Sequence, residues 1–192
     1  MNDEQTLSEA AAALARGEVV GVPTDTVYGL AVDPWSETAI DDLYDLKGRP
    51  EHRPIGLLVA SLEQAGEIAD LGPGTTLARH WPGALTLVVR PRVMIPDWIG
   101  DRVLRTVGLR VPDHDLLRRL LQMTGPLAVT SANRSGEGET LDDIAARGVF
   151  GSGIAVYVPG HSPGGVASTV VDATGASVRL LRAGPIVIAE DG

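Results

Sequence analysis

A short segment rich in cations, residues 47–54 (KGRPEHRP), carries the side chains best suited to chemistry on anions. The chain has 16 basic residues, and Lys47 is its only lysine. Lysine presents a compact, rotatable point charge, whereas arginines such as Arg49 and Arg53 present a planar fork that grips two oxygen atoms at once. Two prolines, Pro50 and Pro54, limit the freedom of the backbone in this segment. This combination indicates a binding segment for a polyphosphate.

The same segment also fits an ordinary helix end. A cation in the last turn followed by a left-handed glycine is a common way for a helix to stop, and Lys47 with Gly48 matches that pattern. The segment alone therefore does not decide between a binding site and a helix cap. The other polar groups along the chain have to decide it.

Further polar side chains follow apolar segments that read as strands. Ligands of open α/β sheets bind outside the ends of strands, so these side chains are candidates for one shared site. Each of them also has a simpler interpretation as a turn residue or a solvated surface group. The candidates are Thr24, Asp25, Thr26, Arg110, Thr130, Ser131, Asn133, Ser168, Thr169 and Arg182.

Several familiar catalytic signatures are missing or fail. The chain has no Walker A sequence and no cysteine, and its four histidines lack metal-ligand spacing, so we expect no protein-built metal site. Residues 160–164 (GHSPG) match the nucleophile pattern of serine hydrolases. That pattern needs a strand before the serine and a helix after it, whereas Pro163 and glycines follow Ser162. We therefore expect Ser162→Ala to be silent.

Composition excludes other classes. The formal charge is −9, which disfavours broad nucleic-acid binding because such binding depends on phosphate contacts. The acidic N-terminal residues do not form a signal peptide, and no apolar run reaches the ~20 residues that span a bilayer. The expectation is a cytoplasmic globular protein with no membrane association.

The elements that position these residues alternate between helix and strand early and become strand-rich late. This order predicts an α/β fold with an open, twisted, mixed sheet flanked by helices, in a single domain of residues 1–192. Predicted helices cover 7–16 (capped by Thr6), 36–47, 61–69, 75–81, 114–123 (capped by Asp113) and 140–147 (capped by Thr140). Predicted strands cover 19–22, 27–32, 55–60, 85–89, 107–111, 127–130, 155–158, 169–172 and 178–181.

Six segments together resemble the YrdC-like family, the threonylcarbamoyl-AMP synthases. They occur in the family's order and cover nearly the whole chain. One departure is Leu58, where some relatives carry histidine, and the second C-terminal domain of longer relatives has no counterpart here. The segments are 23–30 (PTDTVYGL), 47–50 (KGRP), 81–87 (WPGALTL), 107–112 (VGLRVP), 130–133 (TSAN) and 168–172 (STVVD).

The resemblance implies a concave, basic active surface on which L-threonine, bicarbonate and ATP form threonylcarbamoyl-AMP and diphosphate, for tRNA modification to threonylcarbamoyladenosine. Lys47 and Arg49 would act in catalysis beside the phosphates. Mg²⁺ would arrive with ATP. The other implied ATP ligands are Arg53, Thr106, Asn133 and Arg182, and the implied threonine ligands are Thr26, Arg110, Ser168 and, near the junction, Ser131.

The partners implied are these small substrates and a tRNA threonylcarbamoyl transferase that receives the adenylate, with no stable nucleic-acid binding by this chain alone. Two other functions stay open. An RNA-binding module of the same fold would use the concave basic surface without synthase activity. A related carbamoyl-transfer domain would act on a different acceptor, normally inside a much larger chain.

Overall fold

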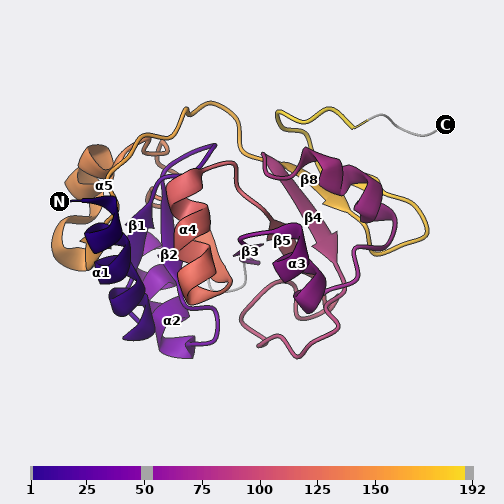
Figure 1. Cartoon of the computed structure of the whole chain (residues 1–192), viewed down its shortest axis with the longest axis horizontal. Coiled ribbons are helices and arrows are strands. Elements are labelled where there is room, and N and C mark those ends of the chain that lie inside the picture. The colour runs from indigo at the N-terminus through magenta and orange to yellow at the C-terminus, as the bar shows by residue number, and fades with distance from the viewer. Residues whose placement is uncertain (1, 49–53, 189–192) are drawn as a thin grey trace.

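The computed structural model describes residues 2–48 and 54–188, and within this part nine strands form one open mixed sheet (Figure 1). Their spatial order is β7, β1, β2, β6, β3, β5, β4, β8, β9. β1 lies parallel to β7, and β4 lies parallel to β8, so distant segments become neighbours. The predicted α/β class is confirmed. The strands are β1 (Val20–Val22), β2 (Gly29–Val32), β3 (Leu57–Leu58), β4 (Leu85–Val89), β5 (Val107–Arg110), β6 (Leu127–Ser131), β7 (Val156–Tyr157), β8 (Thr169–Asp172) and β9 (Arg179–Arg182).

Helices cover both faces of the sheet around β1 and β2 (Figure 1). α1 (Asp3–Ala15) and α4 (Asp115–Thr124) bury leucines against one face, in a cluster that includes Val20 and Val22 of β1. α2 (Glu37–Lys47) and α5 (Asp143–Phe150) pack in a second cluster with Leu30 of β2. Successive strand residues point to opposite faces, which is why these short strands are buried throughout.

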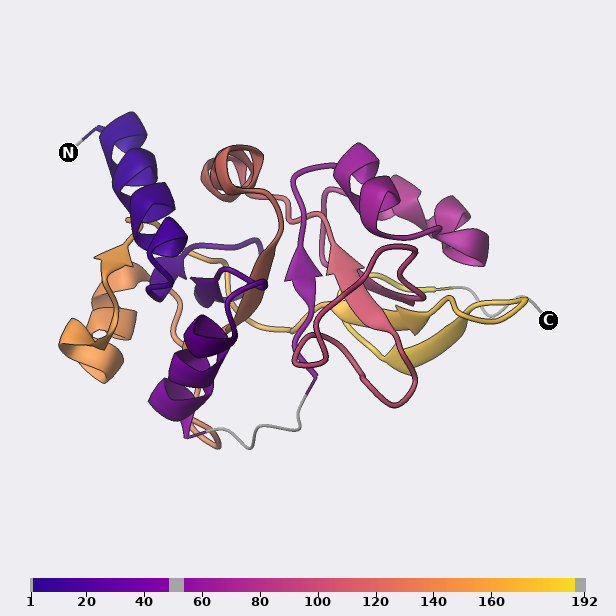
Figure 2. The same cartoon turned by 90° about the horizontal axis from the view of Figure 1, so that it is seen from below.

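The other half of the sheet is covered differently. α3 (Leu62–Ile68) and the 3₁₀ helix η1 (Gly72–His80) lie on one side of β4, β5 and β8 (Figure 2). Leu85, Leu87 and Val89 of β4 are buried in the core that these helices share, whereas Thr86 and Val88 line a cavity on the opposite face. Alternation along one strand thus supplies both the core and the floor of a site.

Local capping signals explain several helix ends. The side-chain oxygen of Ser36 accepts from Ala39 N at 3.3 Å, and that of Ser61 accepts from Gln64 N at 3.2 Å, as predicted. Gly48 adopts the left-handed conformation (φ 57°, ψ 36°) and ends α2 directly after Lys47. The helix end and the binding segment are therefore compatible interpretations of the same residues.

Three predicted caps are wrong because a neighbouring residue or a tertiary contact takes their place. Asn2, not Thr6, begins α1, and its side chain accepts from Glu4 N. The cap of α4 is His114 and not Asp113. Asp142 replaces Thr140 as the cap of α5, because the Thr140 hydroxyl is buried and donates to Ala132 O at 2.6 Å. The remaining helical segment, η2 (Gly151–Gly153), extends the end of α5.

The predicted strand at residues 55–60 is reduced to two ladder residues. Leu57 and Leu58 pair with β5 on one side and β6 on the other. The carbonyl of Ile55 instead accepts from Gly100 N at 3.0 Å, a loop contact outside the ladder. Hydrophobicity predicted burial correctly but not the extent of regular pairing.

Across residues 2–48 and 54–188, each helix is too short or too polar to cross a membrane.

Candidate functional site

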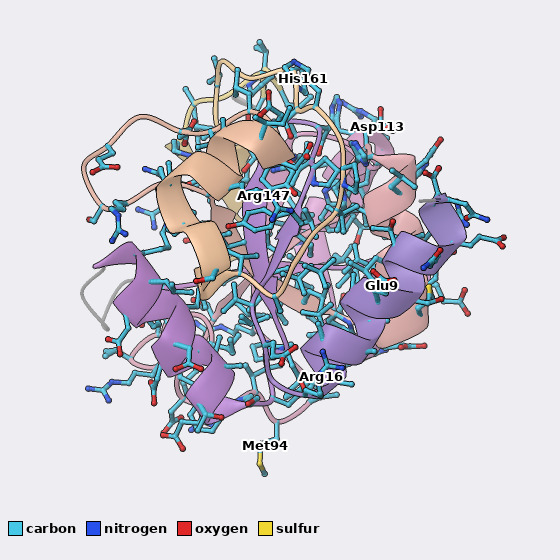
Figure 3. The ribbon with its side chains drawn as sticks, turned by 90° about the vertical axis from the view of Figure 1, so that its left-hand side faces the viewer. Glu9, Arg16, Met94, Asp113, Arg147 and His161 are labelled. Atoms are coloured by element: carbon cyan, nitrogen blue, oxygen red, sulfur yellow. The ribbon has the colours of Figure 1, made fainter. Side chains whose placement is uncertain are left out.

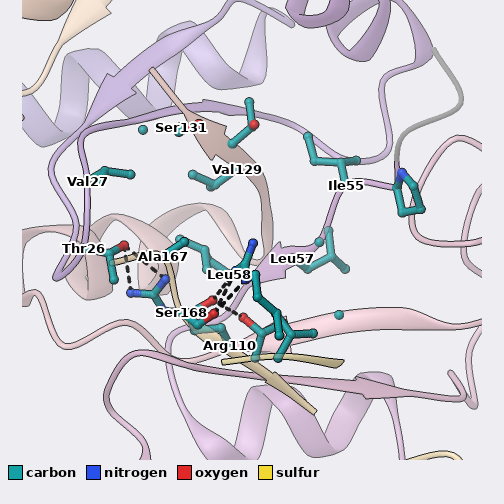
Figure 4. A pocket seen from close by; sticks show the side chains of 18 of the residues that line it. Thr26, Val27, Ile55, Leu57, Leu58, Arg110, Val129, Ser131, Ala167 and Ser168 are labelled. Atoms are coloured by element: carbon teal, nitrogen blue, oxygen red, sulfur yellow. Dashed lines mark hydrogen bonds between the residues drawn. The ribbon is translucent and has the colours of Figure 1, made fainter. Parts of the chain in front are cut away.

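A cavity of about 620 Å³ opens on the face of the sheet that carries Thr86 and Val88 of β4. Figure 4 shows Thr26, Arg110, Ser131 and Ser168 around it, together with apolar residues of the central strands. Eight of the ten sequence-predicted site residues line this cavity. They are Thr26, Lys47, Thr106, Arg110, Ser131, Asn133, Ser168 and Arg182.

The other two predicted residues, Arg49 and Arg53, lie outside the described residues, so their roles remain predictions. Among the described residues, the charged groups of the lining are three cations and two carboxylates, the latter from Asp101 and Glu139.

One side of the cavity holds a buried ion pair that the sequence analysis did not identify as a pair. Arg110 and Asp25 form a salt bridge, with side chains only 9% and 12% exposed. Arg110 Nη1 and Nη2 also donate to Thr26 Oγ1, each at 3.3 Å, and its Nε donates to Gly83 O at 3.2 Å. Burial lowers the pKa of the Arg110 guanidinium, and Asp25 opposes that shift. Arginine stays charged under such conditions, so this side presents a fixed cation.

A second side is built around Lys47, which is only 4% exposed. Its ammonium donates to Ser131 O, to Asn133 O at 2.6 Å and to Asn133 Oδ1 at 3.3 Å. The hydroxyl of Ser131 donates to the same Asn133 Oδ1 at 2.6 Å. The Lys47 ammonium thus links the end of α2 to the end of β6 through these hydrogen bonds.

Arg182 on the edge strand β9 reaches back across β8. Its Nη2 donates to Ser168 O at 2.8 Å and to Ser168 Oγ at 3.2 Å. Ser168 Oγ lies 2.8 Å from Thr86 Oγ1 of the neighbouring β4. The predicted ATP ligand Arg182 and the predicted threonine ligand Ser168 are therefore in direct contact.

Polar residues of the lining that were not predicted as substrate ligands are Thr24, Thr86, Asp101, Thr130, Ser135 and Glu139. Asp25 contacts the lining through its ion pair with Arg110. Asp25 belongs to the polar turn 24–26, whose residues are among the candidates from the sequence. The sequence alone does not indicate that Asp25 pairs with Arg110. Thr86 sits inside an apolar strand and becomes recognisable only through the alternation that exposes it beside Ser168.

The prediction for Ser162 needs correction. The residue lies in the connection between β7 and β8, which runs through residues 158–168, all described and without a helix. A nucleophile elbow is therefore not formed, in agreement with the sequence interpretation. However, Ser162 is fully buried, and its Oγ accepts from Thr24 N at 2.9 Å. Since Ser162→Ala would leave a buried N–H without its acceptor, we no longer expect it to be silent.

His114 at the start of α4 predicts a pH dependence of stability. Its Nδ1 is buried without a hydrogen-bond partner in the described part of the chain. Burial lowers the pKa of His114, and the carboxylates of Asp25, Asp115 and Asp113 oppose the shift. His114 therefore binds a proton more readily in the unfolded chain than in the folded one. The stability that neutral His114 contributes above pH ~6.5 is lost as the pH falls below that value.

The measurement is the urea midpoint at several pH values between about 5 and 8. His114→Gln should flatten the acid-side loss. His161→Gln is the matched control, because His161 is exposed at the surface (Figure 3). An identical pH profile in wild type and His114→Gln would contradict the assignment.

Comparisons with known proteins agree with one another. Residues 12–184 match the protein-family model Sua5/YciO/YrdC, described as telomere recombination. A putative threonylcarbamoyl-AMP synthase of Mycobacterium leprae is 41% identical over 187 residues, covering 95% of this chain and 84% of the relative. The threonylcarbamoyl-AMP synthase of Bacillus subtilis is 39% identical over 194 residues, covering 96% of this chain and 55% of the relative. The structure of Pyrococcus abyssi Sua5 complexed with L-threonine superposes with a TM-score of 0.87 at 33% identity, covering 96% of this chain and 55% of that one.

Proposed function

Because the chain belongs to the Sua5/YciO/YrdC family, we propose that its cavity joins L-threonine, bicarbonate and ATP into threonylcarbamoyl-AMP and diphosphate. The chain is a threonylcarbamoyl-AMP synthase, a nucleotidyltransferase of tRNA modification. The observation that carries the site assignment is that eight residues from distant segments line one cavity.

The reaction sets the demands on this cavity. The amine of threonine forms an N–C bond with bicarbonate and water leaves, which gives a carbamate. A carbamate oxygen then attacks the α-phosphorus of ATP, and diphosphate departs with the electrons of the broken P–O bond. Anions are brought together in that step, so catalysis rests on positioning and on neutralising charge rather than on a covalent nucleophile.

The Arg110 side of the cavity is the proposed threonine subsite. The guanidinium is fixed by Asp25 and Thr26 and supplies a buried positive charge for the carboxylate of the amino acid. Ser168, held by Thr86 and Arg182, provides a hydroxyl in the same lining. Leu58, on β3, contributes an apolar surface to this lining.

The Lys47 side is the proposed phosphate subsite. Its ammonium already donates to oxygens of Ser131 and Asn133, so its main action on ATP is electrostatic, through a charge held in a low-dielectric wall. Arg49 and Arg53 follow in the chain and are proposed to reach the phosphates directly. Thr106 and Asn133 complete the ATP ligands that line the cavity.

Arg182 is proposed to bridge the two subsites, and this gives a mutational prediction. Arg182→Ala should lower kcat/KM for ATP by about 10- to 100-fold, the range expected for loss of a charged hydrogen bond. The unfolding temperature should stay near that of wild type, because Arg182 is exposed. Arg182→Lys is the informative companion, since it keeps the charge but loses the fork.

Kinetics decide this prediction when ATP and threonine are varied separately. The exposed Arg179 on the same strand offers a control, because it pairs with Asp172 away from the cavity lining. A drop in activity for Arg179→Ala equal to that of Arg182→Ala would mean that strand β9, and not the Arg182 fork, is responsible.

Mg²⁺ is proposed to enter with ATP. In the described part of the chain, no group of three or more histidine, cysteine or acidic residues could hold a metal ion. The two carboxylates of the lining, Asp101 and Glu139, suit at most outer contacts, and Asp101 Oδ1 already accepts from two backbone N–H groups. This donor set fits an ion that keeps its waters and binds the triphosphate.

The product is proposed to pass to a tRNA threonylcarbamoyl transferase. The charge of −9 leaves the cations of the cavity as a small basic region on an acidic chain, which disfavours tight tRNA binding by this protein alone. A mixed anhydride hydrolyses readily in water, so direct transfer from the cavity to the next enzyme would protect it. We propose that this exchange takes place in the cytoplasm.

Diphosphate release tests the proposed function. Purified protein is mixed with ATP, Mg²⁺, bicarbonate and L-threonine, and release is expected only when both threonine and bicarbonate are present. Serine should react about 10- to 200-fold less efficiently, because a pocket senses a missing methyl group by ~1–3 kcal/mol. Equal release without any amino acid would contradict the synthase assignment.

A further inference from the structure

The segment 160–164 (GHSPG) carries the buried Ser162 and makes contacts that its sequence does not explain, two of them with the turn that holds Thr24 and Thr26. Ser162 N donates to Leu141 O at 2.7 Å, and its Oγ accepts from Thr24 N at 2.9 Å. Gly164 N donates to Thr26 O at 2.7 Å. This segment therefore holds the turn of residues 23–27 from behind, at two separate backbone positions.

The segment 160–164 packs closely against Pro23 and Leu141. A Cβ on Gly160 would lie 2.8 Å from Cγ of Pro23, and a Cβ on Gly164 would lie 2.9 Å from both methyl carbons of Leu141. Gly164 also has φ +76°, which residues with side chains rarely adopt. Glycine at these two positions lets the segment approach the turn closely enough for both hydrogen bonds.

The hydrogen bonds inside the turn then fix the polarity of Thr26. Thr24 Oγ1 donates its single proton to Val27 O at 2.8 Å. The proton shared between Thr24 Oγ1 and Thr26 Oγ1, which are 3.0 Å apart, must therefore come from Thr26. Thr26 Oγ1 is left with lone pairs, and two of the Arg110 N–H groups point at them.

We infer that Ser162 is a positioning residue for the threonine subsite: through Thr24 it holds Thr26 Oγ1 as the hydrogen-bond acceptor that orients the Arg110 guanidinium toward the substrate. This inference rests on the proposed function for the identity of the substrate. Both lone pairs of Thr26 Oγ1 accept from Arg110, so Thr26 acts on the substrate through that cation, and the carboxylate of the substrate is assigned to Arg110.

Substitution of Ser162 separates positioning from folding. Ser162→Ala deprives the buried Thr24 N–H of its acceptor, and Ser162→Cys keeps the volume but offers a weaker one. Both should raise the KM for threonine, about 3- to 10-fold for alanine, with the KM for ATP unchanged. Binding of L-threonine in the absence of ATP, measured by calorimetry, should weaken by the same factor.

Tyr157→Phe is the control for a simple loss of stability. The Tyr157 hydroxyl donates to Gly151 O at 2.8 Å. Tyr157 lies on β7, the strand at the end of the sheet farthest from β8 and β9. It should lower the unfolding temperature and leave both KM values unchanged.

The outcomes are distinct. Weaker threonine binding in both Ser162 variants, without a change in ATP affinity, supports the inference. Failure of the wild-type protein to release diphosphate would contradict only the proposed function and leaves this binding result valid. Threonine binding equal to wild type in Ser162→Cys overturns the inference, whether or not Ser162→Ala folds. Equal weakening of threonine and ATP overturns it as well, because it indicates general loosening.

Discussion

Replacing Lys47 with methionine is expected to lower kcat for diphosphate release by about 10²- to 10³-fold, as loss of one preorganised donor does in other active sites. Methionine matches the length of the buried stem but removes the charge. Two effects add: the developing negative charge on the phosphates loses a buried cation, and the carbonyl oxygens of Ser131 and Asn133 lose a donor. The end of α2 would then be joined to the residues after β6 only by other contacts, such as the backbone bond from Ser135 N to Lys47 O.

Activity alone does not separate these effects, so a second readout is needed. L-Threonine binding should survive in Lys47→Met, because the Arg110 side of the cavity has its own hydrogen bonds. Arg16→Met is a suitable control, since Arg16 pairs with Glu18 at the surface (Figure 3). Wild-type turnover in a folded Lys47→Met protein would remove Lys47 from the catalytic assignment.

Breaking the Asp25–Arg110 pair should have the largest effect on stability. Asp25→Ala leaves the Arg110 guanidinium buried without its counter-ion, and removing one partner of such a pair costs about 3–5 kcal/mol. Arg110→Met should cost a similar amount, because it strands the carboxylate. The double variant should lose less than the sum, since neither charge is then left alone.

Equilibrium unfolding in urea measures each variant. The pair Asp172–Arg179 provides the comparison, because the Arg179 side chain is 73% exposed, against 9% for Arg110. Arg179→Met should cost less than ~1 kcal/mol. If Asp25→Ala costs no more than Arg179→Met, the buried pair does not anchor the site.

The sequence predicted the composition of the site better than its internal bonding. Thr26, Arg110 and Ser168 belong to short segments that resemble a family, and the structure brings them to one cavity. The bonds between them depend on the register of β4, β5 and β8, which no local pattern specifies. The pairing of Asp25 with Arg110 and the contact of Thr86 with Ser168 were therefore not predicted, although Asp25 and Thr86 lie within the segments that carry the resemblance.

Local signals failed where tertiary contacts compete for the same side chain. Ser36 and Ser61 act as predicted caps, because their hydroxyls meet only the first turn of their own helices. Thr140 carries the same chemistry, but its hydroxyl is used by Ala132 O. Ser162→Ala was expected to be silent because proline and glycine follow Ser162, whereas the structure buries this serine completely.

The position of β8 in the sheet has a consequence for how the protein becomes active during synthesis. Leu85 of β4 pairs with Thr169 of β8, so β4 lacks this neighbour until a strand much later in the sequence has been made. Pairing of such distant segments slows folding, because a long loop must close before any contact rewards it. Ser168 precedes β8 directly and accepts a hydrogen bond from Arg182 of β9. A nascent chain therefore cannot complete the cavity until residues 168–182 have left the ribosome.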